Sequence, residues 1–106
     1  MHALDRLFAT IAARKAGGDT DQSYTAKLLA AGVEKCAKKF GEEATETVIA
    51  AIQKDKTELA KESADVLYHL AVLWAASGIT PEDVYSVLKA REAMSGLEEK
   101  ASRPKP

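Results

Sequence analysis

Apolar residues recur every three or four positions along most of the chain, which is the spacing of one face of an α-helix. The first such segment predicts a helix over residues 3–14, and Gly17 opens a polar loop behind it. Ser23 then stands where an N-cap residue belongs, ahead of a short helix over residues 24–31 that Gly32 closes. The pattern of the first third therefore predicts two helices joined by a loop.

Two longer helices follow, one over residues 33–53 and one from residue 56 or 57 to residue 77, with a tight polar connection between them. The apolar residues expected to face the core in the first are Val33, Ala37, Phe40, Ala44, Val48, Ala51 and Ile52. Those of the second are Leu59, Val66, Leu70, Leu73 and Trp74. From residue 66 to 76 nearly every direction around the second helix is apolar, which a lone small bundle cannot cover. We therefore expect a second copy of the chain to complete the bundle.

The last helix has a strong start signal at Thr80 and Pro81, a threonine N-cap followed by proline at the first helical position. Strand signals are almost absent. The fold class that follows is all-α, a bundle of four to five helices completed by dimerisation. We expect one domain over residues 1–95 and a frayed, charged C-terminal tail over residues 96–106.

Composition narrows the classes of protein to consider. The 106 residues are enough for one domain with its own core. Fifteen basic side chains against sixteen acidic ones give a net charge of −1, so we expect no nucleic-acid partner. No apolar run approaches the roughly 20 residues that span a bilayer, and the first residues do not read as a secretory signal. Cys36 is the only cysteine, which suits a reducing compartment, so we expect a cytoplasmic protein without a membrane partner.

The two long helices each carry a pair of acidic residues. Glu43 and Glu46 in the first, and Glu62 and Asp65 in the second, are three positions apart, so each pair projects from one face. Acids on helices usually lie on a solvated face. Here both pairs border the apolar side of their helix, and the flank that carries Glu62 and Asp65 turns apolar toward the C-terminus. We therefore expect the two pairs to face each other in an antiparallel packing.

Four carboxylates gathered at the edge of a core repel one another and raise one another's pKa values. A divalent cation relieves that repulsion. Oxygen ligands without a cysteine or histidine pattern favour Mg²⁺ or Mn²⁺ over zinc. Mg²⁺ held by few protein ligands takes phosphate oxygens as partners, so the pattern favours a polyphosphate substrate. A di-iron site is a weaker interpretation, because the Glu-x-x-His pairs of such bundles are missing from the sequence.

The order and spacing of these residues resemble a known family. Glu42-Glu43-x-x-Glu46 followed by Glu62-x-x-Asp65 resembles the EExxE…ExxD signature of the all-α nucleoside triphosphate pyrophosphohydrolases, the MazG-type superfamily. Within it, the segments LDRLFATIAARK, SYTAKLLAAG, KKFGEEATETVIAA and ELAKESADVLYHLAVL look like the phosphoribosyl-ATP pyrophosphatase family. The resemblance covers residues 3–93. One departure is the residue before Gly41, which is phenylalanine here and commonly valine or a similar aliphatic residue in the family.

The resemblance implies an enzyme that hydrolyses phosphoribosyl-ATP to phosphoribosyl-AMP and pyrophosphate, the second step of histidine biosynthesis, with Mg²⁺ and as a helical homodimer. It also implies that Glu43, Glu46, Glu62 and Asp65 hold the metal and carry catalysis, by metal-assisted attack of water on the α–β phosphoanhydride. Which carboxylate acts as the base stays open. The alternatives are a related deoxynucleoside triphosphate pyrophosphatase and a non-catalytic, metal-binding helical dimer.

Six further residues are candidates for binding the substrate: Lys39, Glu42, Arg14, Lys27, Ser23 and Tyr24. Lys39 lies four residues before Glu43, so it forms either a salt bridge or a phosphate contact. Arg14 and Lys27 lie on either side of the loop after the first helix and suit the second phosphate group of the substrate.

Other polar residues near these motifs have a structural interpretation beside the functional one. Ser23 is in the first place an N-cap, and Tyr24 either stacks on a base or packs against the protein. Glu42 either faces the substrate or lies on the surface. His69 is expected to be a buried histidine with its hydrogen bonds satisfied rather than a ligand.

Overall fold

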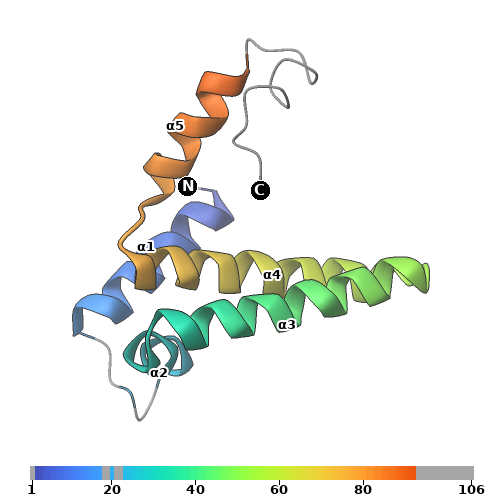
Figure 1. Ribbon diagram of the computed structural model, residues 1–106, viewed down its shortest axis with the longest axis horizontal. Helices are drawn as coiled ribbons and strands as arrows, with labels where there is room; N and C mark the ends of the chain where they lie inside the picture. Colours follow the sequence, from blue (N-terminus) through green and yellow to red (C-terminus); the bar gives the residue numbers. More distant parts are fainter. Residues whose placement is uncertain (1, 18–19, 21–22, 93–106) are drawn as a thin grey trace.

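The computed structural model describes residues 2–17, 20 and 23–92, which form five helices (Figure 1). In chain order these are α1 (Ala3–Gly17), α2 (Tyr24–Ala31), α3 (Val33–Ile52), α4 (Lys56–Ser77) and α5 (Pro81–Arg91). None of the described residues lies in a strand, which confirms the all-α fold class. The tail predicted over residues 96–106 lies outside the described residues.

Polar caps begin the helices where the sequence predicts. The Ser23 hydroxyl at the start of α2 and the Asp55 carboxylate at the start of α4 each accept a hydrogen bond from the amide three residues farther along. Thr80 and Asp83 form a reciprocal capping box at the start of α5. Gly78 ends α4 with a φ of 76°, the left-handed conformation that favours glycine. These local signals explain why the predicted boundaries are close to the observed ones, although α1 runs on to residue 17 rather than ending at 14.

α3 and α4 lie side by side and antiparallel, and they form the long axis of the molecule (Figure 1). A turn over residues 53–55 joins them, with Lys54 in the left-handed backbone region (φ 59°). α1 and α2 pack against one end of this pair only, where α4 ends and α3 begins. The end near the turn extends beyond them.

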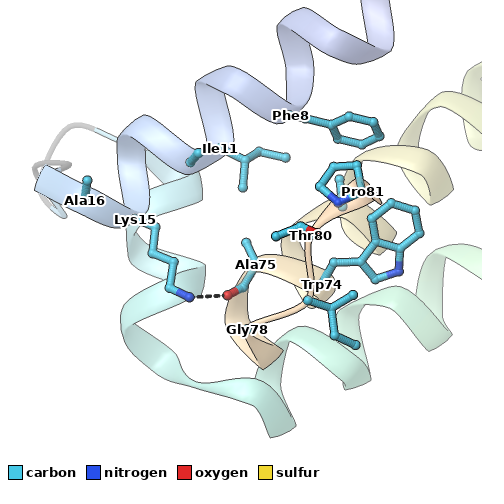
Figure 2. A pocket seen from close by; sticks show the side chains of 12 residues that line it. Phe8, Ile11, Lys15, Ala16, Trp74, Ala75, Gly78, Thr80 and Pro81 are labelled. Atoms are coloured by element: carbon cyan, nitrogen blue, oxygen red, sulfur yellow. Dashed lines mark hydrogen bonds between the residues drawn. The ribbon is translucent and has the colours of Figure 1, made fainter. Parts of the chain in front are cut away.

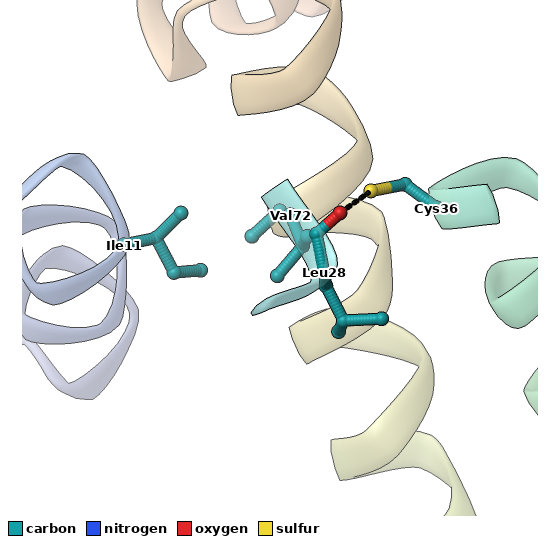
Figure 3. Close-up of a cluster of buried hydrophobic side chains, with 5 residues drawn as sticks. Ile11, Leu28, Cys36 and Val72 are labelled. Carbon is teal, nitrogen blue, oxygen red and sulfur yellow. Dashed lines mark hydrogen bonds between the residues drawn. The ribbon is translucent and has the colours of Figure 1, made fainter. Parts of the chain in front are cut away.

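The fully buried core lies at the end that α1 and α2 cover (Figure 3). Its members are Ile11 of α1, Leu28 of α2, Cys36 of α3, and Ala71 and Val72 of α4. The Cys36 thiol donates a hydrogen bond to the carbonyl oxygen of Leu28 at 3.3 Å. Four helices therefore meet in one small core, which fixes the register of α3 against α4.

The buried face of α3 differs from the predicted one. The predicted apolar face is turned largely outward, with Val48 55% and Ile52 74% exposed. The fully buried residues are Cys36 and Ala50, which lie at the shoulder of the predicted face. Their side chains are small, which suits the close packing of α3 against its neighbours. The larger apolar residues of α3 are therefore left uncovered in a single chain.

A similar rotation is present on α4. The predicted core residues of this helix, Leu59, Val66, Leu70, Leu73 and Trp74, are only partly buried. The fully buried residues are His69, Ala71 and Val72. The flank that carries Glu62 and Asp65 toward His69 therefore lies closer to the centre of the molecule than the helical pattern predicts.

α5 projects away from the other helices, and none of its residues is fully buried (Figure 1). A mostly apolar cavity of about 520 Å³ lies between α1, the end of α4 and the start of α5 (Figure 2). Phe8 and Trp74 line it with their ring centroids 5.8 Å apart, and the Lys15 ammonium group donates a hydrogen bond to the Ala75 carbonyl oxygen. Within the described ranges, no helix combines the length and apolar character that crossing a membrane requires.

Candidate active site

The two acidic pairs meet at the α3–α4 interface. Because the helices run antiparallel, Glu43 of α3 comes opposite Glu62 and Asp65 of α4. One carboxylate oxygen from each of these three residues lies within 4.8 Å of the corresponding oxygens of the other two. The fold therefore brings together side chains of the two acidic pairs, as their spacing in the sequence predicted.

Glu46 is the fourth predicted residue, and it lies about one turn after Glu43 on α3. Its carboxyl group acts on both Glu43 and Glu62, because its hydrogen bonding and charge help to raise the pKa of each. Glu43 and Glu62 are partly buried, whereas Glu46 and Asp65 are exposed. We refer to these four residues as the acidic cluster.

Full ionisation of the acidic cluster is unfavourable. Burial, together with hydrogen bonding and repulsion from Glu46, raises the pKa of Glu62 from 4.5 to about 7. Burial and the charges of Glu46 and Asp65 also raise the pKa of Glu43, although a hydrogen bond with Glu62 lowers it. At neutral pH the cluster therefore tends to retain a proton when no cation balances its charge.

The geometry of the acidic cluster fits a divalent cation. Oε2 of Glu62 is buried and has no hydrogen-bond partner among the described residues, which is a costly state for a carboxylate oxygen. Oxygens that bind one Mg²⁺ at about 2.1 Å are at most about 4.2 Å apart. The observed spacing of up to 4.8 Å is close to that limit, so small side-chain rotations bring the three oxygens within reach of one ion.

Thr47 connects the two halves of the site and was not identified from the sequence. Its hydroxyl group lies within hydrogen-bond distance of the carbonyl oxygens of Glu43 (2.9 Å) and Glu62 (3.3 Å). This contact ties α3 to α4 directly behind two residues of the acidic cluster. The sequence feature that could have identified Thr47 is its position four residues after Glu43, on the same face of the helix.

Lys39 forms its salt bridge with Glu42 rather than with Glu43, the partner that its spacing suggested. The Lys39 ammonium nitrogen lies 3.4 Å from Oε2 of Glu42, and both side chains are partly exposed. Exposed pairs of this kind contribute little to stability. The Lys39 ammonium group therefore stays accessible about one helical turn before Glu43.

Ser23 and Tyr24 have different roles at the start of α2. Ser23 caps the helix, as predicted, through the hydrogen bond from the Ala26 amide to its hydroxyl oxygen at 3.1 Å. The Tyr24 ring stacks on the Tyr68 ring of α4, with centroids 6.5 Å apart and an interplanar angle of 19°. Tyr24 remains 54% exposed, so the stacking covers only part of its surface.

Arg14 and Lys27, the two basic residues predicted to bind one phosphate group, lie on α1 and α2, which pack against each other. Arg14 lines a cavity of about 240 Å³ together with Lys15 and Ala76, and Ala26, the residue before Lys27, lines it as well. Ala76 follows Asp65 by about three turns of α4, which corresponds to roughly 16 Å. The cavity that Arg14 lines is therefore displaced by roughly 16 Å along α4 from Asp65.

His69 is buried as predicted, but its hydrogen bonds are not satisfied. The residue is 6% exposed, and its Nδ1 atom is covered and has no hydrogen-bond partner within the described ranges. The imidazole ring lies edge-on to both tyrosine rings, with its centroid 5.0 Å from that of Tyr68 and 6.3 Å from that of Tyr24. A polar group thus lies buried beside two tyrosines that stack on each other.

Comparison with known proteins places these residues in a family context. Residues 4–92 match the sequence model of a family described as phosphoribosyl-ATP pyrophosphohydrolase. A phosphoribosyl-ATP pyrophosphatase of Cereibacter sphaeroides is 58% identical over 103 residues, which cover 97% of this chain and 99% of the relative. Proteins of the same name are 62% identical in Parvibaculum lavamentivorans (94% and 91% covered) and 57% identical in Dinoroseobacter shibae (97% and 100% covered).

Proposed function

Because the chain belongs to the phosphoribosyl-ATP pyrophosphohydrolase family, we propose that it hydrolyses phosphoribosyl-ATP to phosphoribosyl-AMP and pyrophosphate, a step of histidine biosynthesis. The structural observation that carries this proposal is the convergence of three carboxylate oxygens from α3 and α4 within 4.8 Å. Release of pyrophosphate from a triphosphate requires cleavage of the α–β phosphoanhydride. Such a cleavage depends mainly on positioning and on balancing the charge of the phosphates.

Glu43, Glu46, Glu62 and Asp65 are the residues that would hold Mg²⁺, or alternatively Mn²⁺. Oε2 of Glu62, which has no hydrogen-bond partner in the described part of the chain, supports this assignment, as does the unfavourable charge of the cluster. A bound divalent ion neutralises charge on the phosphoryl oxygens and acidifies a water molecule. One carboxylate of the acidic cluster would act as the base for the water that attacks the α–β phosphoanhydride. The Thr47 hydroxyl keeps the α3 and α4 halves of the cluster in register.

The remaining candidate residues lie in two regions of the molecule, which suit different phosphate groups of the substrate. Lys39 and Glu42 lie beside the acidic cluster, where the Lys39 ammonium group can bind a phosphate oxygen. Arg14, at roughly 16 Å along α4, suits the distal phosphate of the phosphoribosyl group. Ser23 acts indirectly, by fixing the start of α2 and thereby Tyr24. Lys27 is exposed on α2, and its ammonium group is the second candidate for binding that distal phosphate.

Exposed apolar residues support a homodimer. Val48, Ile49 and Ile52 near the end of α3 are 55%, 48% and 74% exposed, and Leu67 of α4 is 46% exposed. Large apolar side chains grouped on one element are typical of a surface that another chain covers. A second copy that packs against this end of the α3–α4 pair would bury these residues and lie next to the acidic cluster.

The proposed reaction and the single cysteine also support a cytoplasmic location. Nucleoside triphosphate derivatives are available there, and Cys36 forms no disulfide in the structure. A reducing compartment keeps such a thiol free. Cell fractionation followed by immunodetection tests this placement, and recovery of the protein outside the cytoplasm would contradict it.

Measurement of pyrophosphate release tests the proposed function. We expect turnover of phosphoribosyl-ATP in the presence of Mg²⁺, no turnover after addition of a chelator, and recovery when excess Mg²⁺ or Mn²⁺ is added. Deoxynucleoside triphosphates in parallel assays test the related alternative. Activity on deoxynucleotides alone would overturn the substrate assignment, and inactivity on every triphosphate would favour a non-catalytic metal-binding dimer.

A further inference from the structure

Three aromatic rings form a cluster where the start of α2 meets α4. Tyr24 and Tyr68 stack with centroids 6.5 Å apart, and His69 lies edge-on to both of them. The Tyr68 hydroxyl is hydrogen-bonded to that of Thr25, which fixes the inner tyrosine. We refer to Tyr24, Tyr68 and His69 as the aromatic cluster. Its outer ring, that of Tyr24, is 54% exposed.

The aromatic cluster lies next to the acidic cluster along α4. His69 follows Asp65 by four residues, so both side chains project from one face of the helix, about 6 Å apart along its axis. The charges of Asp65, Lys39 and Glu42 all act on the His69 ring, while burial lowers its pKa. The imidazole is therefore close to the groups proposed to bind phosphate, and burial favours its neutral form.

The two nitrogens of His69 differ in their surroundings. Nδ1 is covered and has no hydrogen-bond partner among the described residues. A neutral imidazole carries one proton, and a buried N–H without an acceptor is less tolerable than a buried lone pair. The proton therefore belongs on Nε2. Nε2, which is not among the covered side-chain atoms without a partner, is then the hydrogen-bond donor of the ring.

The distances along a nucleotide match this arrangement. When the phosphates of a nucleotide lie at the acidic cluster, the ribose attached to the α-phosphate lies about one helical turn away, and the base lies beyond it. His69 occupies the first of these positions. Tyr24 occupies the second, with an exposed ring that a purine can stack on; such stacking contributes roughly 1–3 kcal/mol for a base on an aromatic side chain.

We propose that the aromatic cluster is the nucleoside subsite of this enzyme, in which the His69 Nε2–H donates a hydrogen bond to a ribose hydroxyl oxygen while the Tyr24 ring stacks on the purine. This inference rests on the proposed function, because it takes the acidic cluster as the phosphate site. His69 then determines specificity for a ribonucleotide, and Tyr68 supports Tyr24 from behind.

Calorimetric binding of two probes in the presence of Mg²⁺ tests the subsite. The first is α,β-methylene-ATP, which resists cleavage at the α–β bond, and the second is tripolyphosphate, which lacks the nucleoside. We expect the wild type to bind the first at least tenfold more tightly. Tyr24→Leu should weaken binding of the nucleotide about tenfold, and Tyr24→Phe less than twofold. Neither should affect tripolyphosphate, and Tyr85→Leu, on α5, is the matched control.

The two amide substitutions at position 69 separate a direct hydrogen bond from a structural role. Glutamine places its amide near Nε2, whereas asparagine places it near Nδ1. We expect His69→Asn to weaken binding of α,β-methylene-ATP about fivefold and His69→Gln less than twofold, with unfolding temperatures recorded for both. Binding of the 2′,3′-dideoxy form of the analogue should be equal in the wild type and His69→Asn.

Several outcomes would overturn the inference. These are equal binding of both probes by the wild type, equal losses in His69→Asn and His69→Gln, or a His69→Asn effect that persists with the dideoxy analogue. Binding is measured without turnover, so these results stand apart from the pyrophosphate assay. Turnover of phosphoribosyl-ATP by the wild type with unchanged binding in Tyr24→Leu and His69→Asn would reject the subsite and leave the proposed function intact.

Discussion

The α3–α4 pair has two unlike ends, and the acidic cluster lies between them. At the end that α1 and α2 cover, Val72 is 0% and Cys36 1% exposed. At the end near the turn, Ile52 is 74% exposed although it belongs to the same pair of helices. One end is thus a packed hydrophobic core. The other is an apolar surface that none of the described residues covers.

This difference explains the chemistry of the residues between the two ends. A carboxylate within the covered end would lose its hydration altogether, whereas one at the open end would behave as an ordinary surface acid. Glu62 lies between the two ends, where burial and Glu46 raise its pKa to about 7 and none of the described residues hydrogen-bonds to its Oε2. Such a position favours the binding of a cation that solvent can deliver and that phosphate oxygens can reach.

The largest expected effect is on turnover, after a substitution in the acidic cluster between the two ends of the α3–α4 pair. Asp65→Asn removes one negative oxygen from the acidic cluster, so we expect turnover of phosphoribosyl-ATP to fall by at least about 100-fold. The unfolding temperature without metal should stay the same or rise, because repulsion is removed. Pyrophosphate release and calorimetry measure the two quantities. Glu82→Gln on α5 is the matched control, and unchanged turnover in Asp65→Asn would contradict the site assignment.

A charge at the open end tests whether a second copy covers it. Ile52→Lys should weaken self-association by about two orders of magnitude, because a lysine would be desolvated without a partner in the interface. Sedimentation velocity over a range of concentrations measures this effect. Leu88→Lys, at a similarly exposed apolar position of α5, is the control. A monomeric wild type, or dissociation by the control alone, would place the dimer interface elsewhere or rule it out.

A cavity at the covered end should affect stability alone. Val72→Ala removes two methyl groups from a fully buried position, so we expect the free energy of unfolding to fall by about 2 kcal/mol. Denaturant unfolding measures the loss. Val87→Ala on the exposed side of α5 should change the free energy by less than about 0.5 kcal/mol. Equal effects of both substitutions would contradict the contrast between covered and uncovered positions.

The smallest expected effect is a pH dependence of the metal-free protein. Between pH 4.5 and about 7 the folded state keeps a proton on Glu62 that the unfolded chain has lost, so this group makes stability fall as pH rises. His69, whose pKa burial lowers, contributes the opposite slope below its ordinary pKa of 6.5. The unfolding temperatures of the wild type and Glu62→Gln are measured in chelator over a range of pH. The difference between the two slopes with pH gives the contribution of Glu62. No difference in slope would contradict the raised pKa.

Much of the architecture was predictable because it depends on neighbouring residues. Ser23, Thr80 and Gly78 fix helix ends through contacts within a few residues, and these ends lie close to the predicted positions. The three-residue spacing within each acidic pair likewise predicted the convergence of Glu43 with Glu62. The predicted salt-bridge partner of Lys39 was wrong, because spacing alone does not distinguish Glu42 from Glu43 across a helical turn.

The sequence by itself determined the helices, their caps and the acidic pairs, since each of these depends on residues at most a few positions apart. The rotation of α3 and α4 was decided only by tertiary structure. Burial of Cys36 and Val72 beneath α1 and α2 sets that rotation. It leaves Ile52 exposed, and it leaves Nδ1 of His69 without a hydrogen-bond partner among the residues that the structure describes. Which side chains are buried depends on contacts among four helices at once. The hydrophobic pattern of a single helix does not specify which of its residues the other helices will cover.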